Sequence, residues 1–506
     1  MTLPATRFDF TAPVPPAADL GRVHFIAIGG AGMSGVARVM LTSGVPVSGS
    51  DARGSALLTA LEHEGAQVWV GHDASHVDGA DTVVVSSAVR DGNVELAAAR
   101  ERGLRVLHRA QGLASTMVGA RGVAVAGANG KTTTTSLLVV ALQAGSLDPS
   151  FALGGELTAL GTNAHRGTGD VFVVEADESD GSFLCYRPQV AVVTSVQADH
   201  LDFYGDLATV EEAYRAFVDT IASDGLLVAC VDDPGARALA EHARGRGLRV
   251  VGYGEAPDAD LRVTDVRHDG LASRATLTLD GRSSPLVLAV PGHHNVLNAA
   301  GAYGAAVAGL GEDPAVVLAG LASFAGTRRR FEPRGTAAGV QVVDDYAHNP
   351  GKLAAVVTTG RRLVDEARER GGTARLVVVF QPHLYSRTRD FAAELGAALV
   401  PADAVVLMDV YAAREDPVPG VSGALVADAV GHAAARAGQP GPQVVYEPSW
   451  VHVAPLVVEL VRPGDLVLTV GAGDVTMVGP EVLLALAERE PRDGTAPSDE
   501  AGEGSA

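Results

Sequence analysis

The pattern of apolar and polar positions predicts a chain of alternating strands and helices. Four short apolar runs, each too short for a helix, occupy residues 22–28, 67–70, 82–86 and 105–107. The first run leads into a glycine-rich loop and then into a helix that we expect to continue to Leu41. This alternation favours an open parallel sheet, with a binding site where the strands end.

A second region of the same kind ends its strands in polar clusters. Predicted strands at 170–174 and 190–196 run into the sequences EADESD and QADHLD. The carboxyl ends of parallel strands lie along one edge of a sheet. We therefore expect Lys131, Glu175 and His200 to meet in one crevice.

Residues 261–290 change to strict alternation, with DG turns at Asp269 and Asp280, which predicts an antiparallel meander attached to the parallel core. The helix that follows carries Asn295 and Asn298 three positions apart, hence on one face. Amides there could read an adenine edge or simply cap the helix. Beyond the meander, five more strands end in polar or glycine-rich residues and predict another open parallel sheet.

Length and composition limit the classes of protein to consider. A chain of 506 residues exceeds one hydrophobic core, so two to four domains are expected. The net charge of -21 argues against nucleic acid or an anionic membrane as a partner. Two cysteines, no signal sequence and no apolar stretch of about 20 residues favour a cytoplasmic protein. Its oligomeric state, monomer or homodimer, stays open.

The boundaries follow from these patterns. We expect a loose lead at 1–20, a first domain at 21–118, a central domain at 119–326, a third domain at 327–488 and a disordered tail at 489–506.

The loop after the predicted strand at Val123 has the composition of a phosphate cradle. Gly127, Gly130, Lys131 and Thr132 form GxxGKT, in which backbone N–H groups and the ammonium can hold phosphates. Lys131 and Lys352 are the only lysines among 39 Lys and Arg, and a compact ammonium differs chemically from a guanidinium. An NKxD guanine reader is impossible with so few lysines, so ATP is favoured over GTP. An ordinary glycine turn is the alternative.

The first glycine loop, at Gly29 to Gly35, satisfies GxGxxG, and Asp51 follows a second short strand. Such a turn binds a dinucleotide or the pyrophosphate of a nucleotide sugar, with Asp51 on a ribose hydroxyl; a purely structural turn is the alternative. Thr132, Glu175 and His200 could hold Mg²⁺ beside ATP phosphates, since Mg²⁺ takes few protein ligands. The basic cluster at 328–330 is either a phosphate contact or a solvated hinge.

Nine motifs in register resemble the Mur ligases over residues 22–485: GGAGMSG, GANGKTTTT, EADESDGSF, ADHLD, PGHHNVLNA, GTRRRFE, DDYAHNP, FQPHLYSRT and GAGDV. The resemblance implies an α/β protein of three domains: an N-terminal Rossmann-like domain that binds UDP, a central P-loop ATPase with a parallel sheet plus a small antiparallel sheet, and a C-terminal Rossmann-like ligase domain. It implies ligation of L-alanine to the lactyl carboxylate of UDP-N-acetylmuramate through an acyl phosphate, with ATP and Mg²⁺, for peptidoglycan precursors.

The resemblance also implies roles for residues at the matching positions. The ATP site would comprise Gly127, Ala128, Asn129, Gly130, Lys131, Thr132, Thr133, Asn295, Asn298, Arg330, and Asp344 or Asp345 near the ribose. The UDP-sugar site would comprise Gly29, Gly30, Ala31, Gly32, Met33, Ser34, Asp51, His72, Ser86, Ser87 and Arg109. The amino acid would meet Tyr346, His348, His383 and Arg387. The residues implied in catalysis are Lys131, Glu175, His200, His348 and Arg387.

Other functions stay open at this point. A ligase that recycles murein peptide onto the same sugar nucleotide shares several motifs. Asn349 and Leu384 depart from the usual pattern of alanine-adding members, so alanine, glycine and serine remain alternatives. The GxGxxG loop alone would suit an NAD-dependent dehydrogenase, and the phosphate loop alone an ATP-driven switch.

Overall fold

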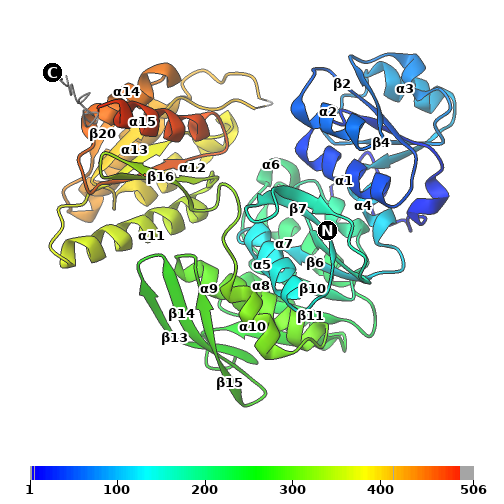
Figure 1. The fold of residues 1–506 in the computed structure, drawn as a ribbon, viewed down its shortest axis with the longest axis horizontal. Helices are drawn as coiled ribbons and strands as arrows, with labels where there is room; N and C mark the ends of the chain where they lie inside the picture. Colours follow the sequence, from blue (N-terminus) through cyan, green and yellow to red (C-terminus); the bar gives the residue numbers. More distant parts are fainter. Residues whose placement is uncertain (1–2, 5, 414, 490–506) are drawn as a thin grey trace, which may run out of the picture. The chain divides into compact units, whose positions relative to one another are not determined.

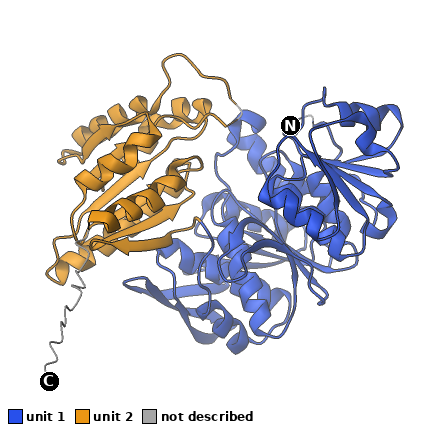
Figure 2. Cartoon of the chain, turned by 45° about the horizontal axis from the view of Figure 1, so that its top comes forward, with its two compact units in different colours: residues 1–328 blue, residues 329–506 orange. Residues whose placement is uncertain are grey.

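The computed structural model describes residues 3–4, 6–413 and 415–489. The chain divides into two compact units, residues 1–328 and residues 329–506 (Figure 2). The first unit contains two sheets and the second contains one (Figure 1). Apart from Arg489, the tail predicted at 489–506 lies outside the described residues. The α/β fold class with N-terminal, middle and C-terminal domains is confirmed.

The N-terminal sheet has five parallel strands in the order β3-β2-β1-β4-β5. The strands are β1 (Val23–Ile26), β2 (Val47–Asp51), β3 (Gln67–Val70), β4 (Thr82–Val85) and β5 (Arg105–His108). The helices between them are α1 (Ala31–Thr42), α2 (Ala56–His63), α3 (Val94–Glu101) and α4 (Arg109–Met117). Strand order reverses at β1, which places the first glycine loop at the switch point where open α/β sheets bind ligands.

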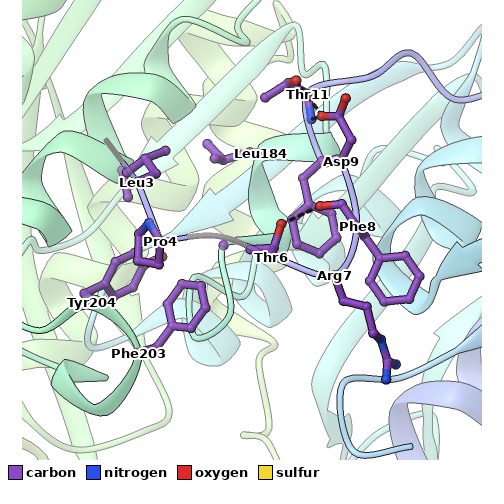
Figure 3. A pocket seen from close by; sticks show the side chains of 13 residues that line it. Leu3, Pro4, Thr6, Arg7, Phe8, Asp9, Thr11, Leu184, Phe203 and Tyr204 are labelled. Carbon is purple, nitrogen blue, oxygen red and sulfur yellow. Dashed lines mark hydrogen bonds between the residues drawn. The ribbon is translucent and has the colours of Figure 1, made fainter. Parts of the chain in front are cut away.

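The N-terminal lead makes specific contacts, whereas loose chain was expected there. Phe10 is buried, Gln111 donates to the carbonyl oxygen of Asp9 at 2.9 Å, and Arg187 donates to that of Thr11 at 2.8 Å. Figure 3 shows the apolar pocket that this lead shares with the middle domain. It is lined by Leu3, Pro4, Thr6, Arg7, Phe8, Asp9, Phe10, Thr11, Gly181, Leu184, Phe203, Tyr204 and Ala213.

The middle sheet has ten strands in the order β15-β14-β13-β12-β11-β10-β6-β9-β7-β8. They are β6 (Arg121–Ala126), β7 (Ser150–Leu157), β8 (Thr162–His165), β9 (Val171–Glu175), β10 (Val190–Val193), β11 (Leu226–Cys230), β12 (Arg249–Gly254), β13 (Leu261–Asp269), β14 (Ala272–Leu279) and β15 (Arg282–Leu288). The helices are α5 (Lys131–Ala144), α6 (Leu201–Tyr204), α7 (Leu207–Val218), α8 (Pro234–Gly245), α9 (His293–Gly304) and α10 (Pro314–Ala322).

Two features of this sheet matter for the site. The predicted meander is β13 to β15, and its first strand pairs with β12, so it extends the main sheet rather than forming a separate one. Strand β6 lies between β10 and β9 and runs parallel to both. The loops that follow these three strands therefore share one edge.

The second unit has one six-stranded sheet in the order β16-β17-β21-β18-β19-β20, with only the β16–β17 pair antiparallel among the described strands. The strands are β16 (Glu332–Ala337), β17 (Val340–Asp345), β18 (Leu376–Phe380), β19 (Ala404–Leu407), β20 (Gln443–Tyr446) and β21 (Leu466–Val470). The helices are α11 (Pro350–Glu369), α12 (Tyr385–Leu399), α13 (Gly423–Ala437), α14 (Trp450–Leu460) and α15 (Val475–Arg489).

Apolar residues on both faces of this sheet form separate buried clusters. Within the described part of the chain, no helix combines the length and the apolar character needed to cross a lipid bilayer.

Candidate functional site

The loop between β6 and α5 is held in one conformation by close packing. Gly127 and Gly130 have φ values of 137° and 83°, in the region that favours glycine. A Cβ on Gly127 would overlap the hydroxyl of Thr194, and one on Gly130 would overlap the amide oxygen of Asn298. The main-chain N–H of Asn129 donates to the hydroxyl of Ser195 at 3.1 Å. The loop therefore presents a fixed backbone at the start of α5, where the helix dipole favours an anion.

Lys131 is nearly buried at the first position of α5. Its Nζ donates to the carbonyl oxygen of Gly127 and to Oε1 of Glu178, both at 2.7 Å. Burial alone would lower the pKa of Lys131, but the charges of Glu178, Asp177 and Glu175 outweigh it and raise that pKa above its usual value. The ammonium thus keeps its charge in the loop.

Thr132 and Glu175 form a second contact at the same edge. The hydroxyl of Thr132 donates to Oε1 of Glu175 at 2.9 Å, and the main-chain N–H of Gly154 donates to Oε2 at 2.7 Å. Glu175 ends β9, the strand directly beside β6. The expected meeting of the GKT loop with this carboxylate is present in the structure.

Glu178 belongs to this site, although the sequence did not predict it. Its side chain is 3% exposed, Oε1 contacts Lys131, and Nε2 of His200 lies 3.8 Å from the same oxygen. Oε2 is buried and has no hydrogen-bond partner among the described residues. The sequence EADE places Glu178 three residues after Glu175, but charged side chains in a loop after a strand are ordinarily solvated. Only the fold shows that Glu178 is buried.

These residues fit a divalent cation that also binds phosphate. In the described ranges, no three His, Cys, Asp or Glu side chains could hold a metal by themselves. Mg²⁺ commonly takes one or two carboxylates and completes its shell with substrate phosphates and water. The partnerless oxygen of Glu178, together with Glu175, Thr132 and His200, supplies a donor set of this type.

Asn295 and Asn298 lie against the phosphate loop rather than on an exposed face. Asn298 donates to Oδ1 of Asn295 at 3.2 Å, and Asn295 donates to the carbonyl oxygen of Pro291 at 2.7 Å. Both side chains are buried. The oxygen of Asn298 approaches Gly130 so closely that a Cβ has no room there. Contact with adenine stays a prediction for both residues.

In the N-terminal domain, the first glycine loop is tied to the end of β2. The main-chain N–H of Gly29 donates to Oδ2 of Asp51 at 2.9 Å, so this carboxylate stabilises the loop. Helix α1 begins at Ala31, and a Cβ on Gly32 would overlap the guanidinium of Arg109. A helix N-terminus beside an arginine suits a diphosphate.

The end of this sheet also touches the acidic loop after β9. Ser87 donates to Oδ2 of Asp180, and Arg109 lies 3.7 Å from the carboxylate of Asp177. Nε2 of His108 lies 3.1 Å from the hydroxyl of Ser87. Burial lowers the pKa of His108 to about 4, so the imidazole is neutral at pH 7. Residues predicted for the UDP-sugar site thus contact the loop that carries Glu178.

Within the second unit, the residues predicted for the amino acid form a cluster of rings. The centroids of Tyr346 and His348 are 5.2 Å apart, and those of His348 and His383 are 5.6 Å apart. Nδ1 of His348 lies 2.9 Å from the carbonyl oxygen of Tyr346. Burial, reinforced by the charges of Lys352 and Arg387, lowers the pKa of His348 well below its usual value. The imidazole is neutral, with Nδ1–H donating and Nε2 able to accept a proton.

Asp344, Asp345 and Arg330 occupy the start of the same unit. Asp344 accepts hydrogen bonds from Thr469 and Thr476, at 2.7 and 2.9 Å. Asp345 accepts from two main-chain N–H groups, and burial raises its pKa to about 6. Arg330 lies over the ring of Tyr346 at 5.4 Å. Both aspartates hold local structure, and their contact with a ribose stays a prediction.

Comparisons with known proteins cover all three domains. Residues 22–121 match the model described as "Mur ligase family, catalytic domain", residues 125–306 the "Mur ligase middle domain", and residues 329–473 the "Mur ligase, glutamate ligase domain".

Individual relatives agree with these matches. A UDP-N-acetylmuramate–L-alanine ligase of Kineococcus radiotolerans is 56% identical over 94% of this chain and 99% of its own length. The crystal structure of the UDP-N-acetylmuramate-alanine ligase of Thermotoga maritima has a TM-score of 0.73 at 28% identity, covering 92% of this chain and 98% of that one. A murein peptide ligase of Psychrobacter arcticus shares the fold, with a TM-score of 0.64 at 22% identity over 92% of this chain and 99% of that one.

Proposed function

This chain belongs to the Mur ligase family, and from that membership and the geometry of its phosphate loop we propose that it joins L-alanine to the lactyl carboxylate of UDP-N-acetylmuramate, using ATP. The observation that carries the proposal is the buried Lys131–Glu178 pair at the start of α5, beside Thr132 and Glu175. A charged ammonium in a fixed glycine loop is what a transferring phosphoryl group requires.

The first chemical step forms an acyl phosphate. A lactyl carboxylate oxygen attacks the γ-phosphorus of ATP, the bond to the bridging oxygen breaks, and ADP leaves. Phosphoryl transfer depends on positioning and charge neutralisation. We assign the neutralisation to Lys131 and to the N–H groups of the loop that opens α5. When bound by Thr132, Glu175, Glu178 and His200, Mg²⁺ would neutralise further phosphate charge.

The second step forms the amide. The amine of L-alanine attacks the acyl carbon, and the tetrahedral intermediate expels phosphate. Alanine carries an ammonium at pH 7, which must lose a proton before attack. We assign that proton to Nε2 of His348, which has a free lone pair because Nδ1–H is directed at the carbonyl oxygen of Tyr346. Arg387, with its planar fork of donors, would take the carboxylate of the amino acid.

The sugar nucleotide belongs to the N-terminal domain in this proposal. The start of α1 and Arg109 would hold the diphosphate, with Ser86, Ser87 and His72 at the same edge of the sheet. Arg109 and Ser87 already contact carboxylates of the acidic loop. Phosphate would compete with Asp177 for Arg109.

The direct test separates the phosphoryl step from sugar binding. Lys131→Ala should abolish hydroxylamine-trapped acyl phosphate while the Kd for UDP-N-acetylmuramate stays within a few-fold, because Lys131 and the first glycine loop lie on different sheets. Arg215→Ala, which removes an exposed cation of α7 paired only to neighbouring glutamates among the contacts described, is the control. Undiminished trapping in Lys131→Ala would overturn the assignment.

Selectivity for the amino acid is tested by ADP release that depends on UDP-N-acetylmuramate. We expect L-alanine to be preferred over glycine by about ten- to a hundredfold, since one methyl contributes ~1–3 kcal/mol, and some activity with L-serine, which adds a hydroxyl to that methyl. A tripeptide should be inactive. A preference for the tripeptide would favour a murein peptide ligase instead.

A further inference from the structure

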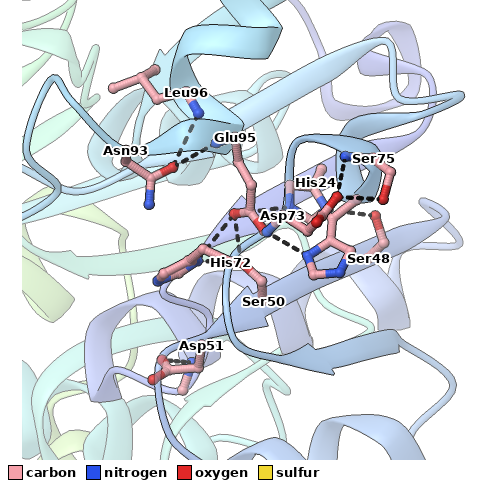
Figure 4. Close-up of polar contacts among 12 residues, drawn as sticks. His24, Ser48, Ser50, Asp51, His72, Asp73, Ser75, Asn93, Glu95 and Leu96 are labelled. Carbon is pink, nitrogen blue, oxygen red and sulfur yellow. Dashed lines mark hydrogen bonds and ion pairs between the residues drawn. The ribbon is translucent and has the colours of Figure 1, made fainter.

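A buried carboxylate in the N-terminal domain is surrounded by imidazoles. Glu95 lies in the first turn of α3, and its side chain is fully buried. Figure 4 shows it between β1, β2 and the segment after β3, with His24, Ser50 and His72 beside it. His72 is one of the residues assigned above to the sugar nucleotide, whereas Glu95 has no role in the chemistry described so far.

Both oxygens of Glu95 accept hydrogen bonds. Oε2 accepts from the hydroxyl of Ser50 at 2.6 Å and lies 3.2 Å from Nδ1 of His72, which is also 3.0 Å from the oxygen of that hydroxyl. Nε2 of His24 lies 3.6 Å from Oε2. Oε1 lies 2.7 Å from Nδ1 of His76 and accepts from the main-chain N–H of Asp73 at 3.3 Å. Because the hydrogen of Ser50 is donated to Oε2, Nδ1 of His72 faces two oxygens that can only accept, and it must carry the proton. Nδ1 of His76 faces Oε1 and must carry a proton for the same reason.

This requirement fixes the tautomer of His72. With Nδ1 protonated, Nε2 of a neutral ring carries a lone pair. His72 is 25% exposed, and among the described residues no hydrogen bond engages Nε2. The main-chain N–H of Gly71 donates to the carbonyl oxygen of Asp51 at 2.7 Å, and Asp51 in turn holds the N–H of Gly29. Asp51 therefore links the segment that leads into His72 to the first glycine loop.

We propose that Glu95 is a positioning residue for the sugar nucleotide: it holds His72 so that Nε2 accepts a hydrogen bond from a hydroxyl or N–H group of the nucleoside. The inference rests on the proposed function, because it places the nucleoside of the UDP sugar at this edge. A carboxylate behind an imidazole is a common way to orient the ring and select its tautomer.

The experiment uses the full-length protein and UDP as the probe. Glu95→Gln keeps the shape of the side chain but offers an N–H that cannot accept from His72. We expect a Kd for UDP, and a KM for UDP-N-acetylmuramate, raised about tenfold, which corresponds to one hydrogen bond, with kcat within twofold. His72→Ala should have the same effect, and the double variant should be no worse than either.

His76→Phe is the matched control. It removes a donor from the other oxygen of Glu95 while keeping a ring on Trp69, whose centroid is 4.6 Å from that of His76. We expect unchanged UDP affinity. Deoxyuridine diphosphates lack a ribose hydroxyl, and an N3-methyl analogue lacks the base N–H. The analogue that lacks the group donating to His72 should bind equally well to the parent protein and to His72→Ala.

Long-range ¹H–¹⁵N correlation spectra of the unsubstituted protein test the tautomer without any variant. A protonated Nδ1 in His72 is expected, and a protonated Nε2 would overturn the inference even if Glu95→Gln failed to fold. Unchanged UDP affinity in Glu95→Gln, or additive effects with His72→Ala, would overturn it while leaving the proposed function intact. Absence of UDP binding by the unsubstituted protein would overturn both.

Discussion

At the scale of single residues, burial decides which acidic side chains of the site matter. The sequence predicted Glu175 because it directly follows a strand, and the structure joins it to Thr132. Glu178 could not be predicted, since its burial depends on tertiary contacts. The hydroxyl of Tyr204, on α6, donates to the main-chain oxygen of Glu178, and the ammonium of Lys131 contacts Oε1 of the Glu178 side chain.

Removing the charge of Glu178 should therefore impair phosphoryl transfer. In Glu178→Gln, we expect single-turnover formation of trapped acyl phosphate to fall by about a hundredfold, because the ammonium of Lys131 loses its partner and the proposed Mg²⁺ site loses a ligand. Glu156→Gln is the control, since Glu156 pairs with Arg328 at a more exposed position. Equal rates in the two variants would contradict the role of Glu178.

Glu95 should make the stability of the N-terminal domain depend on pH. Burial alone raises its pKa, but contacts with His24, Ser50 and His76 outweigh burial and lower that pKa from 4.5 to about 2. A carboxyl group whose pKa is lowered on folding stabilises the fold above its unfolded pKa. That contribution, roughly 3 kcal/mol, is lost as pH falls from about 4.5 towards 2.

Urea unfolding followed by Trp69 fluorescence in a Trp450→Phe background measures this effect, since the chain has two tryptophans. The difference in unfolding free energy between the parent and Glu95→Gln should shrink as pH is lowered from 6 to 3. A difference independent of pH would contradict the lowered pKa.

At the scale of elements, the apolar runs located the strands well because a buried parallel strand is apolar on both faces. The strand predicted at 82–86 is β4, whose four residues are all buried, and the meander occupies β13 to β15. No strand was predicted for β7, β8, β11, β12 or β16. Of these, Ser150–Leu157 contains two glycines and resembles a loop. The conformation of the phosphate loop also depends on partners distant in sequence, Thr194 and Asn298.

Gly130→Ala should weaken ATP binding for that reason. Its φ of 83° strains an alanine, and the added Cβ would overlap Asn298, so the loop must shift. We expect the Kd for ATP, measured by calorimetry, to rise at least about tenfold. Gly44→Ala is the matched control, because Gly44 has a φ of 80° with open space around its Cβ position. Equal ATP affinity in the two variants would show that the loop tolerates the shift.

At the scale of the whole molecule, sequence patterns predicted three sheets but not how their cores join. Buried residues of the N-terminal and middle domains, such as Phe25 and Phe172, belong to one apolar cluster, which makes residues 1–328 a single compact unit. The second unit has clusters of its own. Shared burial across a boundary cannot be read from periodicity, which reports each strand or helix by itself.

This division predicts separate unfolding transitions with separate reporters. Cys185 and Cys230 lie in the first unit, are 2% and 5% exposed, and have pKa values raised by burial, for Cys230 to about 11. We expect no reaction with a disulfide reagent at pH 8 in the native protein, because the thiols are both protonated and buried.

In increasing denaturant, the thiols should react as the first unit unfolds. Trp450 fluorescence, in a Trp69→Phe background, should follow the second unit with a different midpoint. Coincident midpoints would contradict independent unfolding of the two units.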